Sequence, residues 1–317
     1  MAIEITVQLW QSLNINDGVI MLQQTDRLAL AVPDAEKSAA DLNAIFDSVV
    51  IDDSIDNDAN ARRITLQWGY DQLELFEPIG DGPVAEFINE GKRGLFAGGF
   101  ALDDPASLAA RIDSNGIPVT HQGDRYIIYP KDLRGTGVIL SPIRENEKVG
   151  MNDRIWQITY TVPNLEEGVE FYGELFGLQD ALTSYYTSEV WGYRGAISWF
   201  HSKKGAGLDS LEFLDPYEHD KAAGRFLAKT GGLGGIYMSC VHADALSAIH
   251  ERVDTTGGGW QPSPNNVSTG FIHPRRTSGL LVAVCKCEEF DARRPTPDSD
   301  AWQREPSKVP DSQRSHG

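Results

Sequence analysis

The stretches WQITYTVPN (156–164) and RLALAVPD (27–34) decide the fold of this chain. Both are short apolar runs that end in Val-Pro, followed by Asn164 or Asp34. Proline keeps the preceding residue extended, and the Asn or Asp side chain can accept a free backbone N–H at the start of a helix. Apolar residues then recur every three or four positions; after the first stretch they are Leu165, Val169, Tyr172 and Phe176. Each stretch therefore predicts a strand that leads directly into an amphipathic helix.

The same pattern occurs twice more, at GGFALDDPASLAARIDSNGIPV and at GIYMSCVHADALSAIHERVDTTGG. Pro105 suits the first position of a helix, and Gly116 is a natural stop at its end. β-like runs follow each helix, such as QLELFEP in the first repeat and SLEFLDP in the third. The chain therefore consists of four repeats, each with one strand, one helix and about three further strands. We predict an α+β protein made of four βαβββ modules.

The predicted domain boundaries follow from pairing these modules along the chain. Residues 26–145 hold the first two modules and residues 155–287 hold the last two. The polar stretch RENEKVGMNDR (144–154) links the two halves. Residues 1–25 are expected to form an added N-terminal arm. Residues 288–317 are rich in Pro, Ser and charge, so we expect an extended or disordered tail.

Composition limits the class of protein. The chain has 317 residues, 41% of them apolar, and a formal net charge of −18. Such a negative surface repels nucleic acid and anionic membranes, so neither is an expected partner. No apolar run is long enough to span a bilayer, and the first 25 residues lack the features of a signal peptide. We therefore expect a cytoplasmic protein.

The cysteines are too few for a disulfide framework, since there are three: Cys240, Cys285 and Cys287. Cys285 and Cys287 are two residues apart, so on a strand they face the same side, and this spacing is not that of a zinc knuckle. We interpret them as thiols of the core.

The four modules resemble the vicinal oxygen chelate (VOC) superfamily, which includes glyoxalase I, methylmalonyl-CoA epimerase, bleomycin-binding proteins and extradiol dioxygenases. The resemblance covers residues 26–287 and rests on the AVPD-type strand ends, on LELFEP and on GFIHPRRTSGLLV, with the spacing among them. It implies two tandem cupped sheets, each made of two modules. One fold hosts many activities, so the resemblance indicates the fold more strongly than the function.

In this family a metal is held by four positions in each pair of modules. In the C-terminal pair the resemblance places these positions at Gln157, Glu212, Gly235 and Ala283. In the N-terminal pair it places them at Arg27, Glu74, Ala97 and either Ile139 or Ser141. Arginine, glycine and alanine side chains offer no ligand atom to a cation at neutral pH. The resemblance thus implies that most ligand positions are lost. No metal cofactor is expected, and a divalent metal, if one binds, would use Gln157 and Glu212.

The C-terminal sheet could still hold an organic molecule. Strand alternation predicts one shared face for Gln157, Thr159, Thr161, Glu212, Gly235, Tyr237, Ser239 and Ala283. Glu212 is the candidate base, with His273 or Tyr237 as the acid. The candidate substrate-binding residues are Gln157, Thr159, His201 and Trp199.

These residues also admit structural roles, which the sequence leaves open. Glu212 could be a buried carboxylate that hydrogen-bonds to Gln157. His273 precedes Pro274 and could cap a turn. Arg27 and Glu74 could form a structural ion pair.

Three functions are therefore compared. The favoured one is a VOC-type lyase or isomerase (epimerase) that acts on a small oxygenated organic substrate by acid–base chemistry. The second is a divalent-metal enzyme of the glyoxalase or dioxygenase type, with ligands relocated to Gln157, Glu212, His201 and His273. The third is a non-catalytic binding protein for a small molecule. A buried carboxylate is costly unless it is paired or used, which favours the first over the third. A monomer and a homodimer are both compatible with the sequence.

Overall fold

The computed structural model describes residues 21–200, 208–264 and 268–286. The expectations for residues 1–20, for His201 and Cys287, and for the tail from residue 288 onward lie outside this part of the chain. Among the residues that the structure describes, no helix is long and apolar enough to cross a membrane.

The first two modules contain strands β1 (Gln24–Ala31), β2 (Val49–Asp56), β3 (Ala61–Trp68), β4 (Asp71–Pro78), β5 (Gly94–Leu102), β6 (Thr120–Gln122), β7 (Arg125–Ile128) and β8 (Gly137–Pro142). Their helices are α2 (Ala35–Phe46), α3 (Pro83–Asn89), α4 (Pro105–Ser114) and the 3₁₀ turn η1 (Pro130–Asp132).

The last two modules contain strands β9 (Arg154–Thr161), β10 (Thr183–Ser188), β11 (Tyr193–Trp199), β12 (Ser210–Pro216), β13 (Gly235–His242), β14 (Trp260–Pro262), β15 (Thr269–Ile272) and β16 (Val282–Cys285). Their helices are α5 (Leu165–Phe176), α6 (Ala222–Lys229), α7 (Leu246–Thr255) and the 3₁₀ turns η2 (Asp180–Leu182) and η3 (Pro274–Arg276).

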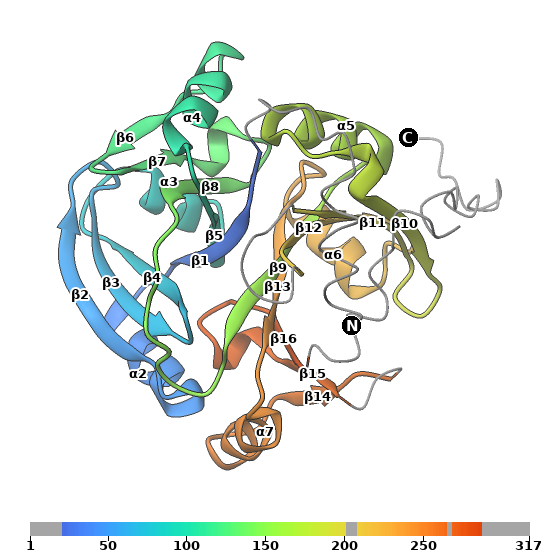
Figure 1. Cartoon of the computed structure of the whole chain (residues 1–317). Helices are drawn as coiled ribbons and strands as arrows, with labels where there is room; N and C mark the ends of the chain where they lie inside the picture. The colour runs from blue at the N-terminus through green and yellow to red at the C-terminus, as the bar shows by residue number, and fades with distance from the viewer. Residues whose placement is uncertain (1–20, 201–207, 265–267, 287–317) are drawn as a thin grey trace, which may run out of the picture.

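The strands form two eight-stranded sheets that share one topology (Figure 1). The first sheet has the order β2-β3-β4-β1-β5-β8-β7-β6, and the second has the order β10-β11-β12-β9-β13-β16-β15-β14. In each sheet the two modules meet at an antiparallel pair of first strands, β1 with β5 and β9 with β13. The prediction of four βαβββ modules in two tandem cupped sheets is confirmed.

The predicted side-chain caps at Asp34 and Asn164 are present at the helix starts, whereas α7 begins after Ala245 with no side-chain cap from Asp244. The Asp34 carboxylate accepts a hydrogen bond of 2.8 Å from the backbone N–H of Lys37, at the start of α2. The Asn164 side chain accepts one of 3.0 Å from the N–H of Glu167, at the start of α5. These bonds satisfy backbone donors that have no partner within the helix.

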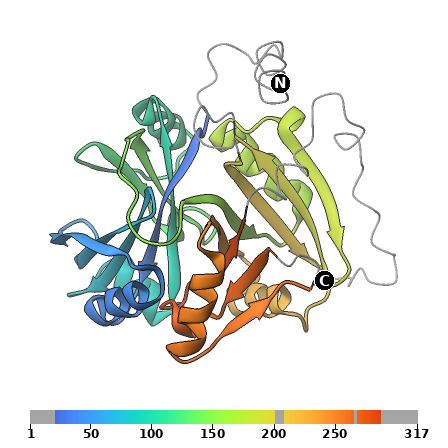
Figure 2. The same ribbon diagram turned by 60° about the horizontal axis from the view of Figure 1, so that its bottom comes forward.

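The main hydrophobic core joins both halves of the chain. The largest buried cluster includes side chains of β1 and α2 as well as of β9 and α5. The Phe100 ring of β5 lies 6.3 Å from that of Phe176 and 5.9 Å from that of Phe200. The two sheets lie side by side in both views, with β1 and β9 near the middle (Figures 1 and 2). The two halves of the chain therefore share their largest hydrophobic core.

Two buried aspartates join the sheets reciprocally. The carboxylate of Asp71, which opens β4, accepts the backbone N–H of Ile155 on β9 at 2.5 Å. The carboxylate of Asp209, which precedes β12, accepts the backbone N–H of Thr25 on β1 at 2.8 Å. Burial raises the pKa of Asp71 well above its usual range. Each half thus supplies the acceptor for the first strand of the other half.

Glycines allow two close backbone contacts between the halves. A Cβ on Gly94 would lie 2.3 Å from the carbonyl oxygen of Gly279, and a Cβ on Gly135 would lie 2.9 Å from that of Gly234. All four glycines have positive φ, between +82° and +95°. Only glycine fits both the space and the backbone conformation at low cost.

Candidate active site

A buried carboxylate lies on the concave face of the second sheet. Glu212 of β12 pairs in register with Thr159 of β9, and Ser210 pairs with Gln157. The Thr159 hydroxyl donates a hydrogen bond of 2.7 Å to Glu212 Oε2. The Tyr186 hydroxyl donates another to Glu212 Oε1. Both oxygens of this carboxylate are thus held by neutral hydroxyl groups.

Tyr186 reaches Glu212 because its neighbour on the next strand is a glycine. Tyr186 of β10 lies opposite Gly195 of β11. A Cβ on Gly195 would lie 2.4 Å from the ring carbon Cζ of Tyr186. The tyrosine ring therefore crosses the β11 backbone at the one point where no side chain stands, and its hydroxyl meets Glu212 on the far strand. The sequence does not single out Tyr186, because TSYYTS offers two tyrosines and no register.

The surroundings favour the neutral form of this carboxyl group. Burial raises the pKa of Glu212, and the hydrogen bonds from Tyr186 and Thr159 offset only part of that rise. No Lys, Arg or His among the described residues forms an ion pair with Glu212. Burial also raises the pKa of Tyr186 well above its usual range. An unpaired buried carboxyl group of this kind is a frequent mark of a functional site.

Three other predicted residues, Trp199, Tyr237 and Ala283, belong to one apolar cluster of the second sheet. The buried cluster here consists of Trp156, Leu182, Trp199, Leu208, Met238, Cys240, Ala283 and Cys285, with Tyr237 packed against it. Cys240 Sγ donates to Gln157 Oε1 at 3.3 Å, and Gln157 Nε2 donates to Ser210 Oγ at 3.4 Å. The hydrogen-bond partners of Glu212 are therefore Thr159 and Tyr186, not Gln157.

An aromatic contact spans the two sides of the concave face. The Trp191 ring, in the turn between β10 and β11, lies 6.0 Å from the Phe271 ring of β15. β11 and β15 stand in opposite halves of the strand order. The Tyr237 ring lies 5.2 Å from that of Phe226 on α6, which covers another side. The sheet is therefore curled into a cup, in which the turn between β10 and β11 approaches β15.

The structure places His273 away from this carboxylate. His273 is exposed, and its Nδ1 accepts the backbone N–H of Arg275 at 3.2 Å. It follows β15, which is four strands from β12 in the sheet order. The side chain thus caps the turn before η3, as the structural alternative predicts. His201, the other predicted histidine, lies outside the described residues.

Strand alternation fails in β13, and the expectation that Ser239 faces the cup is wrong, because Ser239 pairs with the core residue Ile158, whereas Gly235 pairs with Thr161 as expected. The register against β9 shifts between Ile236 and Met238 and again after Cys240. Each bulge adds one residue and so resets which side chains face the cup. Cys240, not Ser239, lies opposite Gln157 on the concave face.

The strand register also shows which residues of this chain occupy the ligand positions that the family resemblance implies. In the first sheet Ala97 lies opposite Ala29, and the matching residue opposite Thr159 in the second sheet is Met238, not Gly235. Ile139, not Ser141, corresponds to Ala283. Ile139 of β8 pairs with Gly99, which lies opposite Arg27, and Ala283 of β16 pairs with Cys240, which lies opposite Gln157.

These residues do not fit the metal site that the family resemblance implies. Ala283 has no ligand atom, and Met238 stands at the third position. Both oxygens of Glu212 accept hydrogen bonds from hydroxyl groups, and the Gln157 oxygen accepts one from Cys240. The donor set on the described part of this face therefore differs from the four-ligand set, and we derive no chemistry through a metal here.

The equivalent carboxylate of the first sheet, Glu74, has its charge balanced by two arginines. Glu74 of β4 is buried, and it accepts hydrogen bonds of 2.9 Å from Arg27 Nη1 and 2.7 Å from Arg125 Nη1. Burial raises the pKa of Glu74, but the guanidinium groups of Arg27 and Arg125 outweigh it, so the pKa is lowered overall. The ion pair between Arg27 and Glu74 that the sequence left open is present.

Apolar side chains fill the first cup. Val84 and Phe87 of α3 belong to a buried cluster with Phe76, Phe96 and other residues of that sheet's concave face. The Phe96 ring lies 5.3 Å from the Phe87 ring and 6.0 Å from the Phe76 ring. Its carboxylate is paired and its centre is packed, so the described residues of the first cup include no unpaired carboxylate like that of Glu212.

No protein-family profile and no curated protein matches the chain. Solved structures do. A triple mutant of 4-hydroxymandelate synthase from Streptomyces coelicolor is 13% identical, with 84% of this chain and 93% of that chain covered at a TM-score of 0.59. BphC, a halotolerant catechol dioxygenase, is 14% identical, with 84% and 87% covered at a TM-score of 0.53. At these identities the likeness is one of fold. Both neighbours are VOC proteins, and the chain accordingly has the tandem fold of the vicinal oxygen chelate superfamily.

Proposed function

We propose that the chain is a VOC-type enzyme, a lyase or an isomerase, that acts on a small oxygenated organic substrate by acid–base chemistry. The observation that carries this proposal is the unpaired carboxyl group of Glu212. Its counterpart Glu74 forms ion pairs with two arginines, whereas the described residues that hold Glu212 do so through hydroxyl groups alone. Such a group costs stability, so its presence in one cup and not in the other supports a function there.

In this proposal Glu212 is the general base. Its carboxylate removes a proton from the carbon next to a substrate carbonyl; the C–H bond breaks, an O–H bond forms on Glu212, and the electron pair moves to the carbonyl oxygen. Return of the proton to the other face gives an isomer, and loss of a neighbouring leaving group gives an elimination product. A raised pKa strengthens a carboxylate as a base near neutral pH.

The remaining residues hold the substrate and the base. Thr159 and Tyr186 fix the Glu212 carboxylate through their hydrogen bonds. Tyr237 is the proposed acid, because burial raises its pKa and keeps its hydroxyl protonated at neutral pH. Gln157 and Trp199 are the proposed substrate contacts on the same face, and His201 remains a prediction.

The test is proton exchange at carbon, which does not require the natural product to be known. The purified protein is incubated in D₂O with 2-oxo acids, 3-oxo acids, 2-hydroxy ketones and enolisable lactones, and the loss of C–H signals is followed by NMR. We expect enzyme-dependent exchange for at least one class, and a loss of about 100-fold or more in Glu212→Gln.

Glu218→Gln is the matched control, because Glu218 is a carboxylate outside the cup that pairs with Lys221. It should retain the wild-type exchange rate. Gly195→Ala and Tyr186→Phe should both slow exchange, since the first displaces the Tyr186 ring and the second removes the hydroxyl that binds Glu212. Exchange at the wild-type rate in Glu212→Gln, or ligand binding with no exchange in any class, would contradict the proposal; the second result identifies a binding protein.

Glu212→Gln is also expected to stabilise the fold at neutral pH, by about 1 kcal/mol. The pKa of Glu212 is raised in the folded state, so its contribution to stability is intact below the pKa of an unfolded glutamate and is lost as pH rises through the folded value. Urea denaturation at pH 7.5 should show the gain, and the same experiment at pH 4 should show a smaller one. Equal destabilisation at both pH values would refute this prediction.

A further inference from the structure

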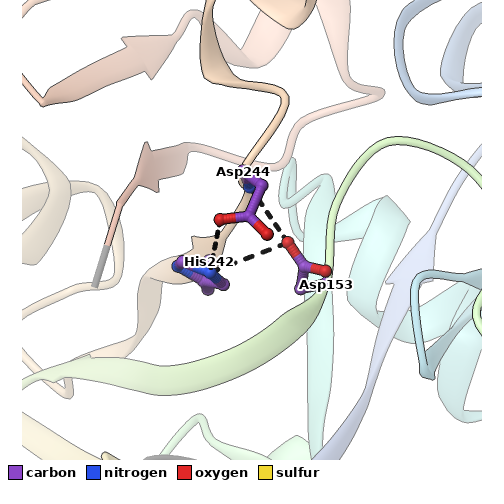
Figure 3. Close-up of side chains that lie close together, drawn as sticks. All are labelled: Asp153, His242 and Asp244. Carbon is purple, nitrogen blue, oxygen red and sulfur yellow. Dashed lines mark hydrogen bonds and ion pairs between the residues drawn. The ribbon is translucent and has the colours of Figure 1, made fainter. Parts of the chain in front are cut away.

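One His and two Asp side chains converge at the end of β13, away from the cup (Figure 3). His242 is the last residue of β13, Asp153 precedes β9, and Asp244 lies two residues beyond His242. His242 Nε2 lies 3.4 Å from Asp244 Oδ1 and 3.7 Å from Asp153 Oδ2. Within the described ranges this is the sole group of three or more His, Cys, Asp or Glu residues whose ligand atoms all lie within 4.8 Å of one another.

The backbone fixes two of these residues relative to each other. His242 pairs with Arg154 at the end of the β9–β13 ladder. The backbone N–H of Asp153 donates to the carbonyl oxygen of His242 at 2.8 Å. The imidazole and the first carboxylate are therefore placed by two paired strands, not by a mobile loop.

Two hydrogen-bond donors, Lys148 and the backbone N–H of Asp244, orient the Asp153 carboxylate. Lys148 Nζ binds its Oδ1, which leaves Oδ2 directed toward His242. The backbone N–H of Asp244 donates to Oδ2 at 3.0 Å. Hydrogen bonds of this kind orient carboxylate ligands in metal sites.

The distances fit a small divalent ion. In a tetrahedral site with bonds of about 2.0–2.1 Å, neighbouring ligand atoms lie about 3.3–3.4 Å apart. The two separations from His242 Nε2, 3.4 Å and 3.7 Å, are close to this value. The Asp244 side chain is 77% exposed, so it can rotate to bring its oxygen nearer to that of Asp153.

We propose that Asp153, His242 and Asp244 bind one divalent transition-metal ion, with Zn²⁺ as the best fit and water completing its coordination. One imidazole and two carboxylates suit Zn²⁺, Co²⁺ or Ni²⁺ better than Mg²⁺, which prefers oxygen ligands alone. The site has a structural role and takes no part in the proposed acid–base reaction, because Thr159, the residue that pairs with Glu212 of β12, lies six residues beyond Asp153 in the chain.

The ion would tie the linker to both halves of the chain. The backbone carbonyl of Asp153 accepts the N–H of Tyr70, in the turn before β4, at 2.8 Å. Asp153 therefore contacts the first sheet through its backbone and the second sheet through His242. Bound metal should raise the unfolding temperature of the whole chain, since ligands that bind only the folded state stabilise it.

The experiment uses the full-length protein without an affinity tag, stripped with a chelator and titrated by calorimetry with ZnCl₂ and separately with MgCl₂. We expect one Zn²⁺ per chain and no saturable Mg²⁺ binding. Asp244→Asn should weaken Zn²⁺ binding by about 10-fold or more, and His242→Gln should weaken it further. The thermal shift produced by Zn²⁺ should be lost in His242→Gln.

Asp254→Asn is the matched control, because His250 and Asp254 form a surface pair at 3.2 Å with a single carboxylate. Its Zn²⁺ affinity should equal that of the wild type. Far-UV circular dichroism of each variant without metal confirms that the fold is intact. The proposal is overturned if Zn²⁺ does not bind at 1 mM, or if His242→Gln binds it as tightly as the wild type. Neither result bears on proton exchange by Glu212.

Discussion

Glu74→Gln is expected to lower the free energy of unfolding by about 3–5 kcal/mol. Arg27 and Arg125 are 8% and 6% exposed, and both donate to the Glu74 carboxylate. With the neutral amide, the charges of two buried guanidinium groups are balanced by the carboxylates of Asp26 and Asp56 without that of Glu74. Removing one member of a buried ion network costs more than the network itself contributes. Guanidinium chloride denaturation at pH 7.5 measures the loss.

The pH dependence of this effect has a definite sign. The pKa of Glu74 is lowered in the folded state, so its contribution is present above the pKa of an unfolded glutamate and is lost as pH falls through the folded value. The gap between wild type and Glu74→Gln should therefore narrow in acid. Glu90→Gln, at an exposed carboxylate paired with Lys92, should change stability by less than about 0.5 kcal/mol. A comparable loss in both variants would contradict a specific role for the buried network.

Gly94→Ala is expected to lower the free energy of unfolding by about 3 kcal/mol or more. The new Cβ would lie 2.3 Å from the carbonyl oxygen of Gly279 and 2.4 Å from its carbonyl carbon. Backbone atoms cannot rotate away as a side chain can, so the two halves must move apart. The φ of +92° at Gly94 adds strain of its own. Thermal and chemical denaturation should both report the loss.

Gly91→Ala separates the two causes. Gly91 has a φ of +78°, but no atom lies within 4 Å of a Cβ built there. This variant should show the cost of the backbone conformation alone, about 1 kcal/mol. If Gly91→Ala and Gly94→Ala destabilise the chain equally, the close contact with Gly279 contributes nothing.

The sequence predicts the local parts of the fold well. The caps at Asp34 and Asn164 depend on neighbours within three residues, so they can be recognised without any knowledge of tertiary structure. The module repeat is readable for the same reason. Strand register is different, because it depends on which strands pair and on bulges such as those in β13. The expected orientation of Ser239 and the assignment of Gly235 to a ligand position fail at that step.

The candidate site likewise has residues that local sequence predicts and residues that depend on tertiary structure. Glu212 is identified because it stands in a strand motif repeated at Glu74. Tyr186, which holds it, is separated by 26 residues and depends on Gly195, which lies on a third strand. Arg125 meets Glu74 across 51 residues. Such partners come from cross-strand geometry that no spacing in the chain encodes.

Because Asp71 and Asp209 make reciprocal hydrogen bonds between the halves, the two halves of this polypeptide pack like the subunits of a symmetric dimer. Each half completes the other, so neither can be discarded even if only one performs chemistry. If Glu212 performs the chemistry proposed above, the first sheet needs no unpaired carboxylate, so its interior can hold the ion pairs of Glu74 and be filled by apolar side chains. Division of labour of this sort is open to a fused pair and closed to two identical subunits, because a substitution in identical subunits changes both cups at once.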